Sequence, residues 1–181
     1  MNLVLKDIVY KMLGTYSLFL TIVGTIFNIM VILICIRKRL WRITTFKFMV
    51  VMAVNDAVSL YQWNLKHFID PFFNIDFNFT SLVWCRLSLF LQYYCLQYSA
   101  WILVSIAFDR LFTVLFQSWK KVYFKDSVPL IFVFSMGIFI GALNFHILFT
   151  NGYALIVNGT ERVICYAQPD FDFTLFNIFG Q

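Results

Sequence analysis

The chain has 181 residues, of which 61% are hydrophobic, 20% aromatic and only 13% charged. Soluble domains carry charge on about a quarter of their residues, so this composition excludes an ordinary soluble domain and predicts a membrane protein. The net charge of +5 does not predict a nucleic-acid partner, because the sidedness of the loops, described below, accounts for it.

Four long stretches with few charged residues predict four complete membrane helices, since about 20 consecutive apolar residues cross a bilayer as a helix. From the charged positions between them, the helices are expected at about residues 13–36, 46–65, 84–116 and 127–149, with the start of a fifth from about residue 171. No repeat or Gly/Ser-rich linker divides residues 1–181, so one domain is expected. The predicted fold class is an all-α membrane protein.

The first apolar stretch is expected to remain in the mature chain. It is longer than the apolar region of a signal peptide, no small-residue cleavage site follows it, and Arg37-Lys38-Arg39 marks its end. It is therefore counted as the first membrane helix.

The second predicted helix carries a carboxylate, Asp56, near its centre. An ionised carboxylate at that depth costs about 2.5–3.5 kcal/mol, so something must compensate for it. The candidates are Asn28 in the first helix, Ser99 in the third, a bound cation, or protonation of the carboxyl group. We favour a hydrated polar pocket over a neutral carboxyl group with a purely structural role.

Polar residues share one face of the third predicted helix. Cys85, Gln92 and Ser99 are spaced by seven residues and point in nearly the same direction. Arg110 returns close to that direction at the inner end of the helix. Because polar groups at membrane depth normally face the interior of a bundle, this face indicates a shared interior. Two alternatives stay open: Ser99 bonds its own backbone, and Gln92 bonds across helices only for packing.

The basic residues predict the orientation of the chain. Nine of the fourteen Lys and Arg residues lie in two connections, 37–47 and 110–125. Short loops rich in Lys and Arg stay on the cytoplasmic side, so these two connections are expected inside. The sequence therefore predicts a multi-pass protein of the plasma membrane with its N-terminus outside.

Two further kinds of mark fall in the connections predicted to lie outside. Asn78-Phe79-Thr80 and Asn158-Gly159-Thr160 match the acceptor pattern for N-glycosylation. Cys85 and Cys165 are also on that side, where an oxidising environment permits a disulfide. The alternative is that both are ordinary buried thiols.

With these residues in place, the chain resembles the rhodopsin-like G-protein-coupled receptors, from its first residue to the start of the predicted fifth helix. The residues that carry the resemblance are Asn28, Val31, Ala53, Asp56, Cys85, Ser99, Asp109, Arg110 and Cys165. The 28 residues from Asn28 to Asp56 and the 25 from Cys85 to Arg110 are the spacings that the family shows. The resemblance implies part of a seven-transmembrane helix bundle, with four complete helices and the beginning of the fifth.

The resemblance also implies roles for the inner residues. Arg110 would be the switch at the inner face, held by Asp109 in the resting state and released to meet a heterotrimeric G protein. Asp56, Asn28 and Ser99 would form an inner polar pocket that holds an allosteric sodium ion in many members. No other metal or cofactor, and no catalytic residue, is expected.

The outer side would receive an extracellular ligand, with the Cys85–Cys165 disulfide fixing the last loop over its entrance. Gln92 stands where receptors for small amines carry an aspartate, so a peptide is favoured over a monoamine. Gln92 and Tyr93 are the candidate ligand-pocket residues. Other aromatic residues near the outer side fit the same interpretation, although for most of them a lipid-facing or interfacial aromatic belt is the preferred explanation.

The chain departs from the family pattern in four places. Leu111 follows Arg110 where a tyrosine is usual, Phe27 precedes Asn28 where a glycine is usual, and Ser135-Met136-Gly137 occupies the place of a helix-four tryptophan. Helices six and seven do not follow within residues 1–181. We therefore expect a truncated portion that is inactive alone, and agonist-dependent signalling from these residues by themselves would contradict this expectation.

Two other classes remain as alternatives. A four-helix structural membrane protein of the tetraspanin type would explain four spans and an outer disulfide, but it does not require Arg110 after Asp109. A transporter or channel fragment would explain Asp56 as an acid in an ion pathway. An enzyme is not expected, because His67 and His146 have neither metal-ligand spacing nor paired carboxylates beside them.

Overall fold

The computed structural model describes residues 3–73, 81–115, 128–157 and 160–167. Its elements in chain order are the helices α1 (Leu3–Cys35), α2 (Lys38–Trp41), α3 (Thr44–Phe73), α5 (Leu82–Leu115), α7 (Val128–Asn144) and α8 (Ile147–Thr150), followed by the strands β1 (Asn151–Val157) and β2 (Thr160–Ala167).

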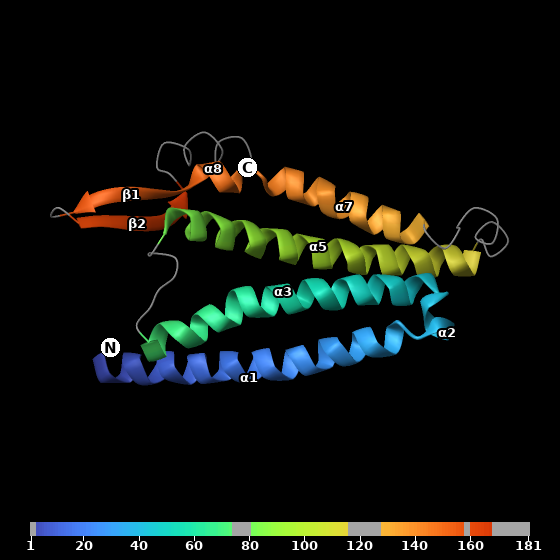
Figure 1. The fold of residues 1–181 in the computed structure, drawn as a ribbon, viewed down its shortest axis with the longest axis horizontal. Coiled ribbons are helices and arrows are strands. Elements are labelled where there is room, and N and C mark those ends of the chain that lie inside the picture. The colour runs from blue at the N-terminus through green and yellow to red at the C-terminus, as the bar shows by residue number, and fades with distance from the viewer. Residues whose placement is uncertain (1–2, 74–80, 116–127, 158–159, 168–181) are drawn as a thin grey trace.

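The four long helices lie side by side in an elongated bundle (Figure 1). Helix α3 packs against α1 and α5, and α5 packs in turn against α7. The N-terminus, the strands and the beginning of α5 lie at one end of the bundle, and α2 lies at the other (Figure 1). Helix α5 ends on the same side of the bundle as α2, so the described basic residues of the two connections lie at one end (Figure 1).

Three segments are long and apolar enough to cross a membrane: Val4–Cys35, Leu82–Leu115 and Val128–Thr150. Helix α3 is also long, with 30 residues, but it carries more polar and charged side chains than these three. It lies between α1 and α5 along the bundle, where those side chains have protein neighbours. The membrane helix bundle expected from the sequence is thus confirmed, with α3 as its most polar member.

The helices extend further than the charge map predicted. Helix α1 begins at Leu3 rather than about residue 13, and α3 continues through Pro71 to Phe73 rather than ending at about residue 65. Charged residues mark where a helix leaves the apolar layer, but a helix continues past that point while its backbone hydrogen bonds are made. The fourth predicted helix is divided into α7 and α8. The predicted fifth helix lies outside the described residues.

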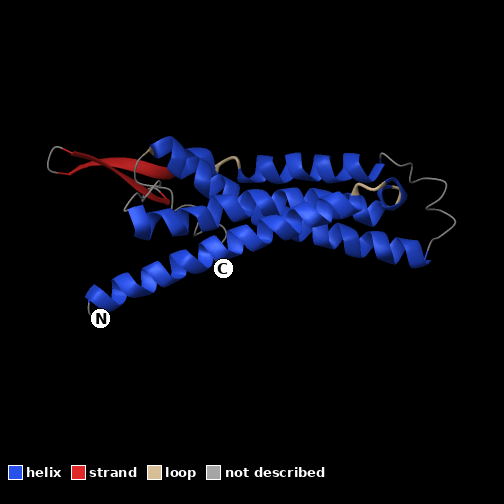
Figure 2. Cartoon of the chain, turned by 60° about the horizontal axis from the view of Figure 1, so that its bottom comes forward, coloured by secondary structure: helices blue, strands red, loops and turns tan. Residues whose placement is uncertain are grey.

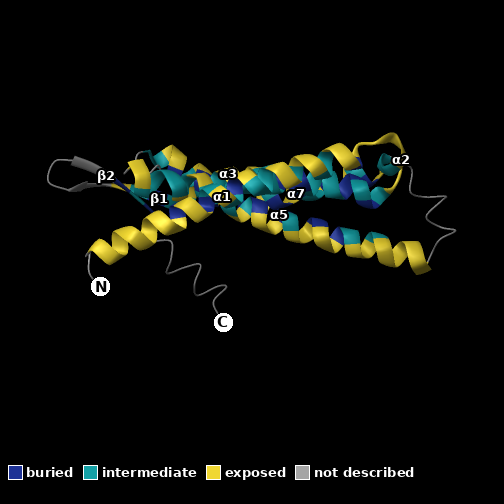
Figure 3. Cartoon of the chain, turned by 90° about the horizontal axis from the view of Figure 1, so that it is seen from below, coloured by how far each residue is buried: buried dark blue, intermediate teal, exposed yellow. Residues whose placement is uncertain are grey.

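The buried core is narrow and sits where α3, α5 and α7 meet. It consists of Phe48, Tyr98, Ile102, Val133 and Ile140. Most of the remaining large apolar side chains face outward, as the exposed surfaces along the helices show (Figure 3). In water such a surface would be unstable, whereas in a bilayer lipid chains cover it.

A β-hairpin, which the sequence analysis did not predict, follows α8 at the end of the bundle that carries the N-terminus (Figure 2). This end is called the outer end below and the end with α2 the inner end, after the sides that the basic residues predict. Its two strands are antiparallel, with Val157 opposite Thr160 and Asn151 opposite Ala167. The register is interrupted between Asn151 and Tyr153, where Gly152 adopts a φ of 79°. Only a glycine adopts that conformation readily, so this position fixes an irregularity at the base of the hairpin.

Candidate functional site

A polar cluster joins α3 to α5 in the middle of the bundle. The Ser99 hydroxyl donates to Oδ1 of Asp56 at 2.8 Å and accepts from Nδ2 of Asn55 at 2.7 Å. Asn55 also donates to the backbone carbonyl of Cys95 at 2.9 Å. Because these groups lie at membrane depth, where water is absent, the contacts supply the hydrogen-bond partners that the polar atoms need.

The cluster brings together two of the three residues predicted for the inner polar pocket. Ser99 bonds Asp56 across the helices, so the alternative in which it bonds only its own backbone does not hold. Asn28 is half-buried in α1, and within the described residues its side chain donates to neither Asp56 nor Ser99. Asn55, rather than Asn28, is the amide side chain that bonds Ser99.

Asn55 was missed by the sequence analysis although a signal was present. It is a second polar residue at membrane depth, next to Asp56, and its side chain is 6% exposed. One residue along a helix turns the side chain by about 100°, which directs Asn55 toward α5 while Asp56 borders open space. Of these two adjacent residues, Asn55 therefore contacts α5 and Asp56 lines the neighbouring cavity.

A cavity of about 460 Å³ opens beside this cluster. Its walls are formed by α3 and α5 and carry one carboxylate, three amide side chains and one hydroxyl. The lining residues are Asp56, Ser59, Leu60, Gln62, Trp63, Asn64, Gln92 and Leu96. The structure therefore places Gln92 on the same cavity as Asp56.

Tyr93, the second ligand-pocket candidate, does not line this cavity. It is the next residue after Gln92 on α5 and its side chain is 48% exposed on the outside of the described bundle. Only Gln92 of the two candidates therefore faces the cavity beside Asp56.

A second α3–α5 contact lies further toward the outer end. Nε2 of Gln62 donates to the Ser88 backbone carbonyl at 2.8 Å and contacts the Ser88 hydroxyl at 2.9 Å. Together with the Asn55–Ser99 contact it fixes the two helices at two levels. The cavity between those levels therefore has rigid polar walls.

At the outer end, a disulfide joins Cys85 to Cys165, with a Cα–Cα distance of 5.6 Å. This pairing agrees with the sequence prediction and connects the first turn of α5 to β2. The other two cysteines, Cys35 and Cys95, are buried thiols. The predicted glycosylation residues Asn78 and Asn158 lie outside the described residues.

At the inner end, Asp109 contacts α3. The Thr45 hydroxyl donates to Oδ2 of Asp109 at 3.0 Å, and Thr45 is 4% exposed. Arg110, the next residue, is exposed. The contact between Asp109 and Arg110 that the resemblance implies for the resting state stays a prediction.

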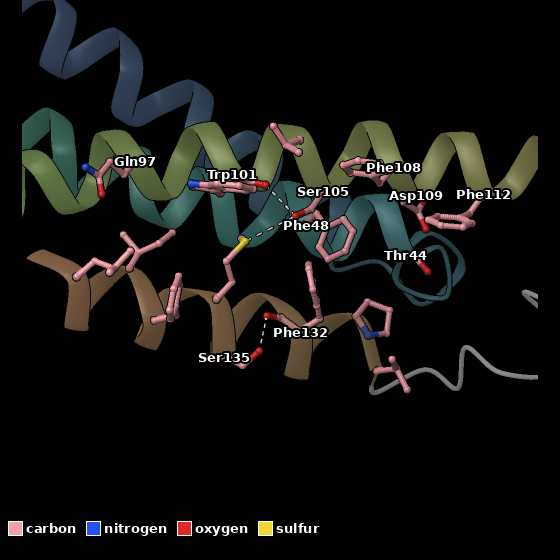
Figure 4. Close-up of a pocket in the computed structure, with 17 residues that line it drawn as sticks. Thr44, Phe48, Gln97, Trp101, Ser105, Phe108, Asp109, Phe112, Phe132 and Ser135 are labelled. Carbon is pink, nitrogen blue, oxygen red and sulfur yellow. Dashed lines mark hydrogen bonds between the residues drawn. The ribbon is translucent and has the colours of Figure 1, made fainter. Parts of the chain in front are cut away.

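A larger, mostly apolar cavity of about 750 Å³ lies between α5 and α7, toward the inner end (Figure 4). Trp101, Phe108, Phe112 and Phe132 contribute aromatic surface to it. Two of its hydroxyl groups are engaged within the protein, since Ser105 donates to the Trp101 carbonyl at 2.8 Å and Ser135 to the Phe132 carbonyl at 2.8 Å. Its mostly apolar surface differs from that of the polar cavity.

The bundle and its contacts define a class of protein: a multi-pass helical membrane protein whose helices are joined by polar side chains at membrane depth. A sequence model of the serpentine type 7TM GPCR chemoreceptor family Srw matches residues 15–178, which is most of the chain. The chain therefore belongs to the Srw family of serpentine 7TM chemoreceptors. A search of curated proteins gave no match.

This membership confirms the receptor class that the resemblance implied, at the level of a G-protein-coupled-receptor-type family. The family named by the match is Srw and not the rhodopsin-like family as such. A chemoreceptor family also favours a receptor over the tetraspanin-type and transporter alternatives.

Proposed function

We propose that this chain belongs to a receptor of the plasma membrane that passes an extracellular chemical signal to a heterotrimeric G protein, with its N-terminus outside. The observation that carries the proposal is the polar cavity between α3 and α5. Asp56 and Gln92 both line it, and Ser99 donates a hydrogen bond to Asp56. Polar groups at this depth are costly and mark functional interiors in membrane bundles.

A peptide is the ligand class that the cavity favours. A monoamine requires a carboxylate at the outer level of the pocket, and the α5 residue there is the neutral Gln92. Gln62, Asn64 and Gln92 instead present amide groups, which donate and accept hydrogen bonds and therefore match peptide backbone groups. Ser59 adds a hydroxyl to the same surface.

A sodium ion is proposed at the deep end of the same cavity. Oδ1 of Asp56 accepts from Ser99, and no described residue donates to the other carboxylate oxygen. Asp56 also lines the cavity. Carboxylate, hydroxyl and amide oxygens are ligands that hard cations prefer. The ion would also neutralise a carboxylate at membrane depth, which is the compensation that Asp56 requires.

Arg110 is proposed as the contact with the G protein. Its exposure at the inner end of α5 supports this role, because an exposed guanidinium can bind backbone carbonyls or carboxylates of a docking partner. The Asp109–Thr45 contact holds the neighbouring carboxylate on α3, so opening of the α3–α5 interface would change the surroundings of Arg110.

The test is ligand-stimulated guanine-nucleotide exchange in membranes that contain the expressed receptor, screened with peptide and monoamine pools. We expect peptides to stimulate exchange and Arg110→Ala to reduce the stimulated rate at least about tenfold with surface expression unchanged. Arg39→Ala is the matched control, since Arg39 is also exposed and basic at the inner end. Stimulation by monoamines alone would contradict the ligand class, and equal effects of the two substitutions would contradict the role of Arg110.

A further inference from the structure

Arg86 reaches from α5 to the base of the outer hairpin. It follows Cys85 in the first turns of α5 and is half-buried. Its Nε donates to the Asn151 carbonyl at 2.8 Å, and its Nη2 donates to the Gly152 carbonyl at 3.2 Å. One guanidinium therefore binds two consecutive carbonyls at the beginning of β1.

The hairpin is shaped to present these carbonyls. Gly152 has no partner residue in the register of the two strands, and its φ of 79° turns the backbone at this point. A Cβ at Gly152 would lie 3.0 Å from the Cys85 sulfur and 3.0 Å from Cδ1 of Leu82. The irregularity thus lets the strand approach α5 closely, and it leaves a carbonyl outside the ladder that needs another donor.

The charged guanidinium of Arg86 has neutral backbone carbonyls as its partners. No described carboxylate forms an ion pair with it. Hydrogen bonds from a charged donor are stronger than neutral ones, and a planar guanidinium holds two acceptors in a fixed geometry that a lysine does not reproduce.

Arg86 and the disulfide hold different strands. The disulfide connects α5 to β2 through Cys165, whereas Arg86 connects α5 to β1. A small apolar contact completes the attachment, in which Val163 and Leu82 pack with the cystine. Breaking the covalent bond therefore leaves the polar attachment of β1 in place.

We infer that Arg86 is a positioning residue of the outer hairpin: it fixes the base of β1 on α5 independently of the disulfide. The hairpin consequently keeps its place at the outer end of the bundle when the cystine is reduced. This inference concerns the attachment of the hairpin and does not depend on the ligand or on G-protein coupling.

The experiment is backbone hydrogen exchange on the full chain in detergent micelles or nanodiscs, with the amides of β1 compared with those of the α3–α5 interface. With the disulfide intact, Arg86→Gln is expected to speed exchange in β1 at least about tenfold and to leave the α3 and α5 amides unchanged. Arg86→Lys should give an intermediate rate, because an ammonium group reaches one carbonyl at a time. Lys11→Gln is the matched control, since Lys11 is also at the outer end and pairs only with Asp7 on an exposed helix face.

Reduction of the folded protein provides the second arm. We expect β1 to remain protected after reduction in the wild type and to lose protection in reduced Arg86→Gln. The inference is overturned if Arg86→Gln leaves β1 exchange unchanged with the disulfide intact. It is equally overturned if that substitution speeds α3 and α5 exchange as much as β1 exchange, which would indicate a general loss of stability.

Discussion

Ser99 uses both hydrogen-bonding capacities of one hydroxyl group, accepting from Asn55 and donating to Asp56. In an apolar surrounding, each bond polarises the next, and the chain of three groups is stronger than isolated pairs. Removal of the middle member therefore leaves both a buried amide and a carboxylate with one contact fewer.

Ser99→Ala is expected to lower the free energy of unfolding by about 1–3 kcal/mol, because two polar groups at membrane depth lose their shared partner. Thermal unfolding in detergent micelles measures the change. Ser135→Ala is the matched control: Ser135 is exposed and bonds only the Phe132 carbonyl of its own helix, so its loss should be nearly neutral. Equal stability of Ser99→Ala and the wild type would show that the hydroxyl does not join the helices.

Asp56→Asn is not expected to destabilise the protein when sodium is absent. A carboxylate at membrane depth is costly, whereas the amide oxygen of asparagine can still accept the hydrogen bond from Ser99. In the wild type, sodium chloride should raise the unfolding temperature relative to choline chloride at the same ionic strength, because an ion that binds only the folded state stabilises it. Asp56→Asn should abolish this difference, whereas Asp70→Asn at the outer end of α3 should retain it. A sodium effect that survives in Asp56→Asn would contradict the proposed site.

At the scale of single residues, the sequence identified polar and paired residues that are unusual at membrane depth. It did not predict which residues they contact. Asp56, Ser99 and the two paired cysteines were identified because a charge, a hydroxyl or an oxidisable pair stands out in an apolar chain. Asn55 and Arg86 were missed because their roles depend on distances between elements, which helical periodicity does not give. Asn28 was assigned to the cluster by resemblance, and the described contacts place Asn55 there instead.

At the scale of elements, the contact between α5 and α7 combines large and small residues. Tyr94 and Tyr98 stack on α5 with ring centroids 5.5 Å apart, and the Tyr98 hydroxyl donates to the Val133 carbonyl at 3.2 Å. Gly137 on α7 faces both rings. The two tyrosines thus supply aromatic surface at the level where α7 lacks the tryptophan usual in related receptors, and the glycine provides the space for it.

Gly137→Ala is expected to unfold at a lower temperature than Gly141→Ala, because its added methyl group overpacks this contact while both substitutions gain the same helix propensity. The new Cβ would lie 3.1 Å from the Tyr94 hydroxyl and 3.2 Å from Cε2 of Tyr98. Gly141→Ala is the control, since its Cβ would meet Tyr94 at 3.7 Å, an ordinary contact distance. Thermal unfolding of the two variants provides the comparison, and a Gly137→Ala variant as stable as Gly141→Ala would contradict the close packing of α5 and α7.

The elements themselves were predictable to different extents. The long helices follow from uncharged runs, which leave the backbone no partner in a bilayer except itself. The ends of the helices could not be predicted from these runs. Lys11 and Lys66 mark the membrane surface, and the hydrogen-bonded backbone of each helix continues beyond it. The hairpin also had a signal, since Asn158-Gly159 between two β-prone segments is typical of a tight turn. A pattern of apolar runs does not reveal a turn of this kind, so the hairpin was not predicted.

At the scale of the whole molecule, the basic residues of the two connections and the disulfide lie at opposite ends of the bundle. Arg37 precedes α2 and Arg39 lies within it at one end, and Arg110 lies in the last turns of α5 at the same end. The cystine and the hairpin occupy the other end, near the N-terminus (Figure 1). Basic connections stay in the cytoplasm and disulfides form outside it, so both features favour the same orientation.

This orientation predicts a specific pattern of glycosylation in a eukaryotic cell. Asn158 and Asn78 should carry glycans, because the charge pattern of the sequence predicts both connections to lie outside. Asn158→Gln and Asn78→Gln should therefore each remove one glycosidase-sensitive shift in apparent mass on a gel. An acceptor sequence engineered into the 116–127 connection should stay unmodified, and Asn64→Gln, which changes an asparagine outside any acceptor sequence, should leave the mass unchanged. A glycan on the 116–127 connection would place Arg110 outside the cell. In that position it could not meet a G protein, and the proposed direction of signalling would be wrong.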